Sequence, residues 1–338
     1  MTLNTFFFTF LKRLRLISEY FILKVNIYIA KLDLQKKLKD KNSSFIYVFD
    51  VSTSSTGYGD FLTSIFFLRY ISLKKKIKFI FINDKVRKDA KKRYKKQEIT
   101  TRLNEFTNIV NFICQNNCTI EKVRWNKFLS KYKENNNIYL KKFILNKKPI
   151  YKINFNILNN IFPKLEKKFQ NKILLKKKDF LKFKIPKKKL NNYIAVGIRM
   201  NYPNENSRNH NKKSIKKFIK YIRNKKINKN KKILLISDKK NSIKLKQIFK
   251  FEKNIYFSKN YTKSFLEDGF YVLSCDYYYQ YYGTGIGVFA EFSKIKFEIF
   301  TDLKRGFLTK DVIRTDQLYS SSKKNSWQTN YQKFINIR

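Results

Sequence analysis

The 338-residue chain has little glycine, proline, cysteine and histidine, with 8, 4, 3 and 1 of each. Since His210 is the single histidine, a His-based triad or a His-rich metal site would have to be built around it. Three cysteines, Cys114, Cys118 and Cys275, argue against a disulfide framework and favour a reducing compartment. No second pair completes a metal site with Cys114 and Cys118, so we expect thiols there rather than metal ligands.

Acidic residues are also scarce, with 24 against 76 basic ones and a formal net charge of +52. Such a charge would attract nucleic acid or anionic lipid. The basic residues are mostly Lys, however, and they accompany abundant Asn, Ile, Phe and Tyr, the set that AT-rich codons encode. The charge therefore reflects nucleotide composition in part, and the rare residue types carry more information. With 43% hydrophobic residues the chain can form true cores, which excludes a disordered protein.

Long hydrophobic runs are absent from residues 1–40, where charged residues interrupt the apolar blocks Phe6 to Leu11 and Ile17 to Leu23. No run reaches the roughly 18 apolar residues that span a bilayer, and charges inside the apolar region argue against a signal peptide. The segment predicts an amphipathic helix, which either rests on the inner face of an anionic membrane or packs on the protein. We therefore expect a cytoplasmic protein, with peripheral membrane contact as one alternative.

The chain is long enough for two domains, and strand-like runs alternate with helix-compatible segments. We predict an α/β fold with two doubly wound βα domains, at residues 41–185 and 190–325. The middle, residues 104–184, shows no clear alternation. The predicted strands are Phe45 to Val51, Ile77 to Asn83, Tyr193 to Met200, Lys232 to Ser237, Asn254 to Phe257, Asp276 to Tyr281 and Lys296 to Phe300. The predicted helices are Phe61 to Ile71, Lys213 to Arg223, Ser242 to Phe249, Phe265 to Leu273 and Gly285 to Phe292.

Five of the eight glycines lie in two clusters, each placed where a predicted strand is followed by a helix. In the first, Gly57-Tyr58-Gly59-Asp60, glycine would permit positive φ and a close approach to an anion or a hydroxyl-rich substrate at the helix N-terminus. A tight turn in which Asp60 caps the helix is the alternative. The second, Gly283-Thr284-Gly285-Ile286-Gly287, predicts a nest of backbone N–H groups that cradles a diphosphate, or else a purely structural turn.

Arginine is the rarer base, and two arginines flank the loop after the first predicted strand of the second domain. Arg199 and Arg208, with Asn209, would leave the carboxyl end of that strand, where open α/β sheets bind ligands. A guanidinium can bind a diphosphate in bidentate fashion and stabilise charge on a departing nucleotide; alternatively, one Arg pairs with a carboxylate and the other is solvated. Ser237 and Asp238 end the next strand, where they would hold a sugar or ribose hydroxyl or cap the following helix.

Three of these segments resemble known enzymes. A strand followed by Gly57-Tyr58-Gly59-Asp60 and an apolar helix resembles the N-terminal loop of heptosyltransferase-like enzymes of the GT-B fold. The strand residues Val196-Gly197-Ile198-Arg199, followed by Ser207-Arg208-Asn209, resemble the Arg-bearing loop of fucosyltransferase-like GT-B enzymes, although Gly197 stands where that group commonly has His. Residues 276–299 are similar to the donor-binding end of both groups. The resemblance implies two Rossmann-like domains facing a cleft, with Asp60 as the base and Arg199 and Arg208 on the donor diphosphate.

We accordingly predict an inverting, metal-independent glycosyltransferase of surface polysaccharide assembly. Its N-terminal domain would bind a glycan or lipid-linked saccharide acceptor and its C-terminal domain a nucleotide sugar, a GDP-sugar being one candidate, without any cofactor. Asp60 and Arg199 would be catalytic, the loop Gly283 to Gly287 would hold the leaving diphosphate, and Asp238 or Glu291 would hold hydroxyls. A basic nucleic-acid-binding protein is the less favoured alternative, and a nucleotide-sugar epimerase on the same fold is another.

Overall fold

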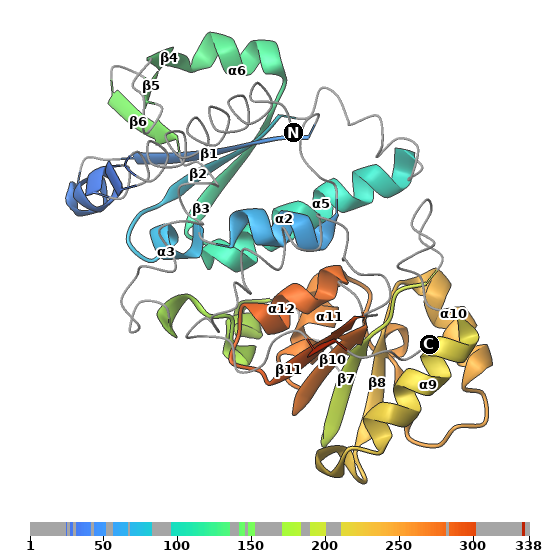
Figure 1. The fold of residues 1–338 in the computed structure, drawn as a ribbon. Helices are drawn as coiled ribbons and strands as arrows, with labels where there is room; N and C mark the ends of the chain where they lie inside the picture. The colour runs from blue at the N-terminus through green and yellow to red at the C-terminus, as the bar shows by residue number, and fades with distance from the viewer. Residues whose placement is uncertain are drawn as a thin grey trace, which may run out of the picture. The chain divides into compact units, whose positions relative to one another are not determined.

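The computed structural model describes residues 25, 28–29, 32–41, 44–51, 57–66, 68–82, 96–135, 142–145, 148–152, 171–183, 190–200, 211–281, 284–301 and 333–334. By its contacts the chain divides into two compact units, whose elements are labelled in Figure 1. Unit 1 comprises Met1–Ser52, Phe67–Lys85 and Asn117–Leu165, and unit 2 comprises Thr53–Phe66, Val86–Asn116 and Glu166–Arg338.

Unit 1 is built on a mixed six-stranded sheet with the order β3-β2-β1-β6-β5-β4. Its strands are β1 (Ser44–Asp50), β2 (Ile77–Ile82), β3 (Cys118–Val123), β4 (Lys133–Asn135), β5 (Lys142–Leu145) and β6 (Lys148–Lys152). The first three and β6 run parallel, whereas β5 pairs antiparallel with β4 and β6. The near-continuous apolar run of β2 is buried, as is typical of a parallel strand covered on both faces. Helices α3 (Leu68–Ser72) and α6 (Trp125–Lys131) also belong to this unit.

Unit 2 contains a six-stranded sheet in which every pairing is parallel. Its strands are β7 (Tyr193–Gly197), β8 (Lys232–Ile236), β9 (Ile255–Phe257), β10 (Tyr277–Tyr281), β11 (Phe297–Thr301) and β12 (Lys333–Phe334). Counted along the chain, the spatial order β9-β8-β7-β10-β11-β12 is 3-2-1-4-5-6, that of a doubly wound Rossmann sheet. The strand order reverses between β7 and β10, so ligands are expected beyond the carboxyl ends of these two strands.

Helices cover both faces of the unit 2 sheet, with α9 (Lys212–Arg223) and α10 (Lys239–Ile248) on one face and α11 (Phe265–Val272) and α12 (Val288–Glu291) on the other (Figure 1). In α9, apolar residues recur with helical spacing and pack on the sheet while lysines face outwards. The unit also holds α2 (Tyr58–Ile65), α5 (Lys96–Cys114) and the short 3-10 segments η2 (Lys177–Lys182), η4 (Lys226–Asn228), η5 (Ser258–Asn260) and η6 (Gly285–Gly287).

An aromatic cluster joins α5, α11, α12 and η2. The ring of Phe180 lies 4.5 Å from Phe112 and 5.6 Å from Phe270, measured between ring centroids, and Phe289 lies 5.3 Å from Phe265. Such ring pairs contribute about 0.5–1.5 kcal/mol each beyond the burial of apolar area. Dense apolar packing therefore contributes to holding the helices around the Gly-rich turn η6.

Among the described residues, four of the five non-glycine positions with left-handed backbone are asparagines, and Gln115 is the fifth. Asn192, Asn230 and Asn254 have φ values of 53°, 63° and 63° and stand directly before or two residues before β7, β8 and β9. Asparagine tolerates this conformation better than other residues with a side chain. Positive φ is therefore not what these strands require glycine for, and the glycines have to be explained by another structural reason.

The α/β class is confirmed, and the strands and helices predicted outside residues 104–184 are present with boundaries shifted by a few residues. The predicted helix Phe61 to Ile71 is instead two helices, α2 and α3, and the predicted helix Gly285 to Phe292 is the 3-10 turn η6 followed by the short helix α12. Sequence alternation did not reveal α5 or β3–β6, because the strand β3 is only partly buried and therefore lacks an apolar pattern. Among the described residues, no helix is long and apolar enough to cross a membrane.

We expect Gly269→Ala to destabilise unit 2. A Cβ atom at Gly269 would lie 2.5 Å from Cε1 of Phe289, whose ring is held by its aromatic neighbours. Overpacking of this kind costs about 1–3 kcal/mol, which exceeds the roughly 1 kcal/mol that alanine gains in helix propensity. Urea unfolding would measure the loss, and adding Phe289→Leu should recover part of it. If Gly269→Ala stabilises the protein, this packing argument is wrong.

Candidate functional site

The first turn of α2 and the turn η6 meet backbone to backbone. A Cβ atom at Gly59 would lie 2.8 Å from the carbonyl oxygen of Gly285, and a Cβ atom at Gly285 would lie 3.0 Å from the backbone nitrogen of Gly59. At the other end of α2, the ring of Phe66 stacks on Phe292 with 3.7 Å between centroids. The two glycine clusters are therefore one structural site, even though more than 220 residues separate them in sequence.

A third segment joins these two at the point where the strand order reverses. Gly197 ends β7, and a Cβ atom there would lie 2.9 Å from Oγ1 of Thr284, the residue before η6. The Thr284 and Tyr278 hydroxyls both donate to Oε1 of the buried Gln280, over 2.9 and 2.8 Å. Burial also raises the pKa of Tyr278, so this hydroxyl stays protonated. The β10 side chains thus fix the start of the Gly-rich turn against the end of β7.

Arg199 follows β7 by two residues and is half-buried. Its neighbour Met200 accepts a 2.7 Å hydrogen bond from Nδ2 of Asn241, and the same amide nitrogen donates to Asp238 over 2.7 Å. Asp238 is the N-cap of α10, where it also accepts from the Asn241 backbone N–H. The loops after β7 and β8 are therefore connected, and the capping role foreseen for Asp238 is present. A contact of Asp238 with a sugar hydroxyl stays a prediction.

The side chain of Tyr58 anchors the first turn of α2 to the surrounding helices. Its ring stacks on Phe265 with 4.9 Å between centroids, and the Arg102 guanidinium lies 4.6 Å from the ring centroid. The Tyr58 hydroxyl and the Phe265 backbone N–H are hydrogen-bonded to the carboxyl group of Glu105 on α5. Burial raises the pKa of Glu105 above its ordinary value, although these partners and the nearby Lys259 and Arg102 favour the carboxylate.

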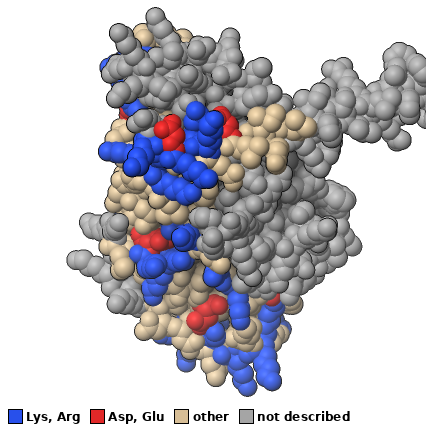
Figure 2. Space-filling view, turned by 90° about the vertical axis from the view of Figure 1, so that its left-hand side faces the viewer, with Lys and Arg blue, Asp and Glu red and all other residues tan. Residues whose placement is uncertain are grey.

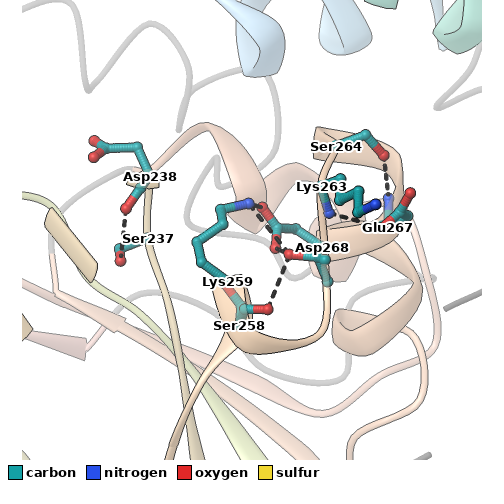
Figure 3. Close-up of polar contacts among 9 residues, drawn as sticks. Ser237, Asp238, Ser258, Lys259, Lys263, Ser264, Glu267 and Asp268 are labelled. Atoms are coloured by element: carbon teal, nitrogen blue, oxygen red, sulfur yellow. Dashed lines mark hydrogen bonds and ion pairs between the residues drawn. The ribbon is translucent and has the colours of Figure 1, made fainter. Parts of the chain in front are cut away.

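A buried ion pair connects the segment that follows β9 with α11. Lys259 contacts Asp268 of α11 over 2.5 Å (Figure 3). The Thr262 hydroxyl donates to the other carboxylate oxygen of Asp268 over 2.6 Å. Burial raises the pKa of Asp268 despite these donors. Figure 3 also shows Asp238 apart from this pair, at the end of β8. Because removing one partner of a buried pair leaves an uncompensated charge, the pair fixes α11 on the segment after β9.

The structure brings together most of the described residues of the predicted site. Gly57, Tyr58, Gly59 and Asp60 form the first turn of α2, with Asp60 exposed; Gly285 lies against Gly59, and Thr284 lies beside Gly197. Ile286, Gly287 and Glu291 are buried, and Ser237 is nearly so, which leaves little of their side chains for a ligand. Arg208, Asn209, Gly283 and the single histidine, His210, lie outside the described residues.

The reason given for the glycines was wrong in one respect. Gly57 has φ of −74° and ψ of 135°, which any residue can adopt, so this turn does not depend on positive φ. At Gly59 and Gly197 the neighbouring atoms come too close for a side chain, and at Gly285 a Cβ atom would make a tight contact with the backbone of Gly59. Close approach of chain to chain, rather than backbone twist, is what retains glycine at this site.

Sequence reasoning missed Glu105, Lys259 and Asp268. The two acidic residues are among only 24 in the chain, so the scarcity that drew attention to glycine could also have drawn attention to them. Lys259 carried no such signal among so many lysines. In the described part of the chain, no group of three or more His, Cys, Asp and Glu residues is arranged to hold a metal ion.

The chain matches no protein-family model and no curated protein sequence. Among solved structures, it is similar to a glycosyl transferase family 9 protein from Veillonella parvula DSM 2008, with a TM-score of 0.38 and 7% sequence identity. That similarity covers 88% of this chain and 86% of the other. A likeness this weak assigns neither a family nor an activity to the chain, so function has to be argued from the site.

We expect Glu105→Gln to make the protein more stable than wild type near neutral pH but not in acid. A raised carboxyl pKa means that the folded state prefers the protonated form. Protonation of Glu105 therefore stabilises the folded state fully below the ordinary pKa of about 4.3, and this stabilisation is lost as the pH rises through the raised pKa. Glutamine can still accept from the Tyr58 hydroxyl without burying a charge. Melting temperatures between about pH 4 and pH 7 would measure the difference.

Glu252→Gln is the matched control, because Glu252 is an exposed partner of Arg223. Its difference from wild type should not grow in the same direction with pH. A Glu105→Gln difference that is constant over this pH range, or that reverses its sign, would show that burial does not control Glu105.

Proposed function

We propose that the chain is a glycosyltransferase that moves a sugar from a nucleotide-sugar donor to a glycan or a lipid-linked saccharide. The single observation that carries this proposal is the meeting of the α2 turn and the Thr284–Gly287 turn beside Gly197, at the switch point of a Rossmann sheet. A switch point is where open parallel sheets bind nucleotides, and the free backbone N–H groups at a helix N-terminus favour phosphate.

The donor diphosphate would lie beside the contact between the two turns, because their backbones are too close together to admit a ligand between them. The first turn of the eight-residue α2 directs backbone N–H groups out of its N-terminus, and the Thr284 hydroxyl stands at the start of the facing turn. Arg199 would approach the same group from the end of β7, and Arg208 and Asn209 would act from the loop that follows it. A planar guanidinium suits a diphosphate better than an ammonium group does.

The reaction would be a single displacement with inversion. Asp60, exposed on α2, would accept the proton of the acceptor hydroxyl as its oxygen attacks the anomeric carbon. The bond from that carbon to the diphosphate breaks, and the nucleoside diphosphate leaves with the bonding electrons. Arg199 and the backbone N–H groups would stabilise the charge that develops there, without a divalent cation or other cofactor. A GDP-sugar is one candidate donor, and surface polysaccharide assembly is the pathway we propose.

The alternatives differ from this proposal in measurable ways. An epimerase on the same fold would convert a nucleotide sugar with no acceptor present and without releasing nucleoside diphosphate. A nucleic-acid-binding protein would bind RNA or DNA with steep salt dependence and would not distinguish nucleoside diphosphates from one another.

We expect at least one nucleoside diphosphate, and the nucleotide sugars that contain it, to raise the melting temperature of the wild-type protein. Saturation at about 100 times the dissociation constant adds about 2.7 kcal/mol to stability. Arg199→Ala removes a charge-assisted contact and should weaken that binding about tenfold to hundredfold, with Arg199→Lys in between. A thermal-shift panel would measure both effects.

Arg223→Ala serves as the matched control, because Arg223 pairs with Glu252 on the surface of α9. It should leave ligand-induced stabilisation unchanged. The donor site is refuted if every nucleotide leaves the wild type unaffected, or if Arg199→Ala responds to nucleotides like Arg223→Ala.

A further inference from the structure

The N-terminal helix of unit 1 carries an exposed apolar stripe. We use this name for Val25, Tyr28, Ile29 and Leu32, on the helix described at residues 25, 28, 29 and 32–39. Leu34 and Leu38 are buried, whereas Val25, Tyr28, Ile29 and Leu32 are 41%, 55%, 37% and 48% exposed. The spacing of three, one and three residues places these four on one face of a helix, opposite the buried pair. The helix therefore packs through one face and presents a second apolar face outwards.

Lysines continue the same face toward the end of the helix. Lys36 and Lys39 follow Leu32 by four and seven residues, so they share its side of the helix, and both are exposed. Two acidic residues are near: Asp33 is half-buried beside the stripe, and Asp40 ends the segment. The exposed face is thus apolar over its first turns and basic over its last.

A neighbouring loop extends this surface. The side chain of Lys75 donates to the backbone carbonyl of Asp40 over 2.6 Å, which brings the loop after α3 to the end of the N-terminal helix. The same loop presents Leu73, 48% exposed, together with the exposed Lys74 and Lys76. Figure 2 faces the side on which this helix lies and shows Lys and Arg side chains in its upper part, with Asp or Glu beside them, as well as further down the molecule. Apolar and basic groups therefore alternate over two adjoining segments.

We propose that this surface docks unit 1 on an anionic lipid bilayer. Val25, Tyr28, Ile29, Leu32 and Leu73 would enter the boundary between headgroups and acyl chains, and the lysines would contact anionic headgroups. An amphipathic helix with a basic end lies in the plane of such an interface, and tyrosine suits its mixed polarity. A second copy of the chain fits less well, because each copy carries a formal charge of +52 and a symmetric contact would bring the same lysines together.

Vesicle flotation of the full-length protein, without any nucleotide or saccharide, tests the proposal independently of the donor site. The vesicles are pure phosphatidylcholine, or a mixture in which about a third of the lipid is phosphatidylglycerol. We expect binding to the anionic vesicles only. Ile29→Ser with Leu32→Ser should lower the partition coefficient about tenfold or more, and Lys36→Gln with Lys39→Gln should lower it by a smaller factor that disappears at high salt.

The matched controls alter residues of unit 2 that are at least as exposed as those of the stripe. Leu181→Ser with Phe251→Ser removes side chains that are 74% and 90% exposed, and Lys226→Gln with Lys229→Gln removes two exposed lysines. Both control proteins should bind vesicles like the wild type. As a second readout, Tyr28→Trp should add fluorescence that shifts to the blue with anionic vesicles but not with phosphatidylcholine alone.

Three results would overturn the proposal. The first is wild-type protein that ignores anionic vesicles or binds both kinds equally. The second is a stripe variant that binds no worse than its control. The third is a wild-type dimer in light scattering that Ile29→Ser with Leu32→Ser converts to a monomer while vesicles have no effect, which would assign the stripe to contact between copies.

Discussion

The close approach of Gly59 to Gly285 is the constraint on which the rest of unit 2 depends. A helix from early in the chain can lie against the Gly-rich turn only because neither residue has a side chain. Tyr58, held by Phe265 and Glu105, and Phe66, stacked on Phe292, keep α2 in that position from both ends. Gly197 then brings the end of β7 to Thr284, and with it Arg199. One packing arrangement thus places backbone amides and the Thr284 hydroxyl at the sheet's switch point, two residues from Arg199 in sequence at the end of β7.

Asparagine and glycine have different structural roles in this chain. Left-handed turns before β7, β8 and β9 are made by asparagine, which this composition supplies in quantity. Glycine is retained where a Cβ atom would collide with a neighbour, at Gly59, Gly197, Gly269, Gly285 and Gly287. In a chain biased toward Lys, Asn and Ile, the position of a glycine therefore marks a tight contact. That is why glycine clusters indicated the site, although the expected positive φ at Gly57 was not the reason.

Much of unit 2 could be predicted from the sequence, because its strands are short, buried apolar runs and α9 has a strict helical period. Most elements of unit 1 that follow β2 in the chain could not be predicted from the sequence. The strand β3 is only partly buried, and β4–β6 lie among Lys- and Asn-rich segments with no alternation. Nor could sequence patterns show that α2 and α5 belong with the second sheet, since that follows from packing of Tyr58, Phe61 and Phe112. Glu105 escaped notice because only its partners in space, Tyr58 and the start of α11, distinguish it from a surface carboxylate.

The proposed donor site requires that the two glycine turns bind one ligand together. Hydrogen–deuterium exchange resolved to short peptides tests this most directly, with the nucleoside diphosphate that gives the largest thermal shift. We predict that the backbone amides of residues 57–61 and 284–288 become protected together and over the same range of ligand concentration, while the amides of α9 do not change. Protection of only one turn, or of neither, would contradict the shared site and with it the proposed donor-binding function.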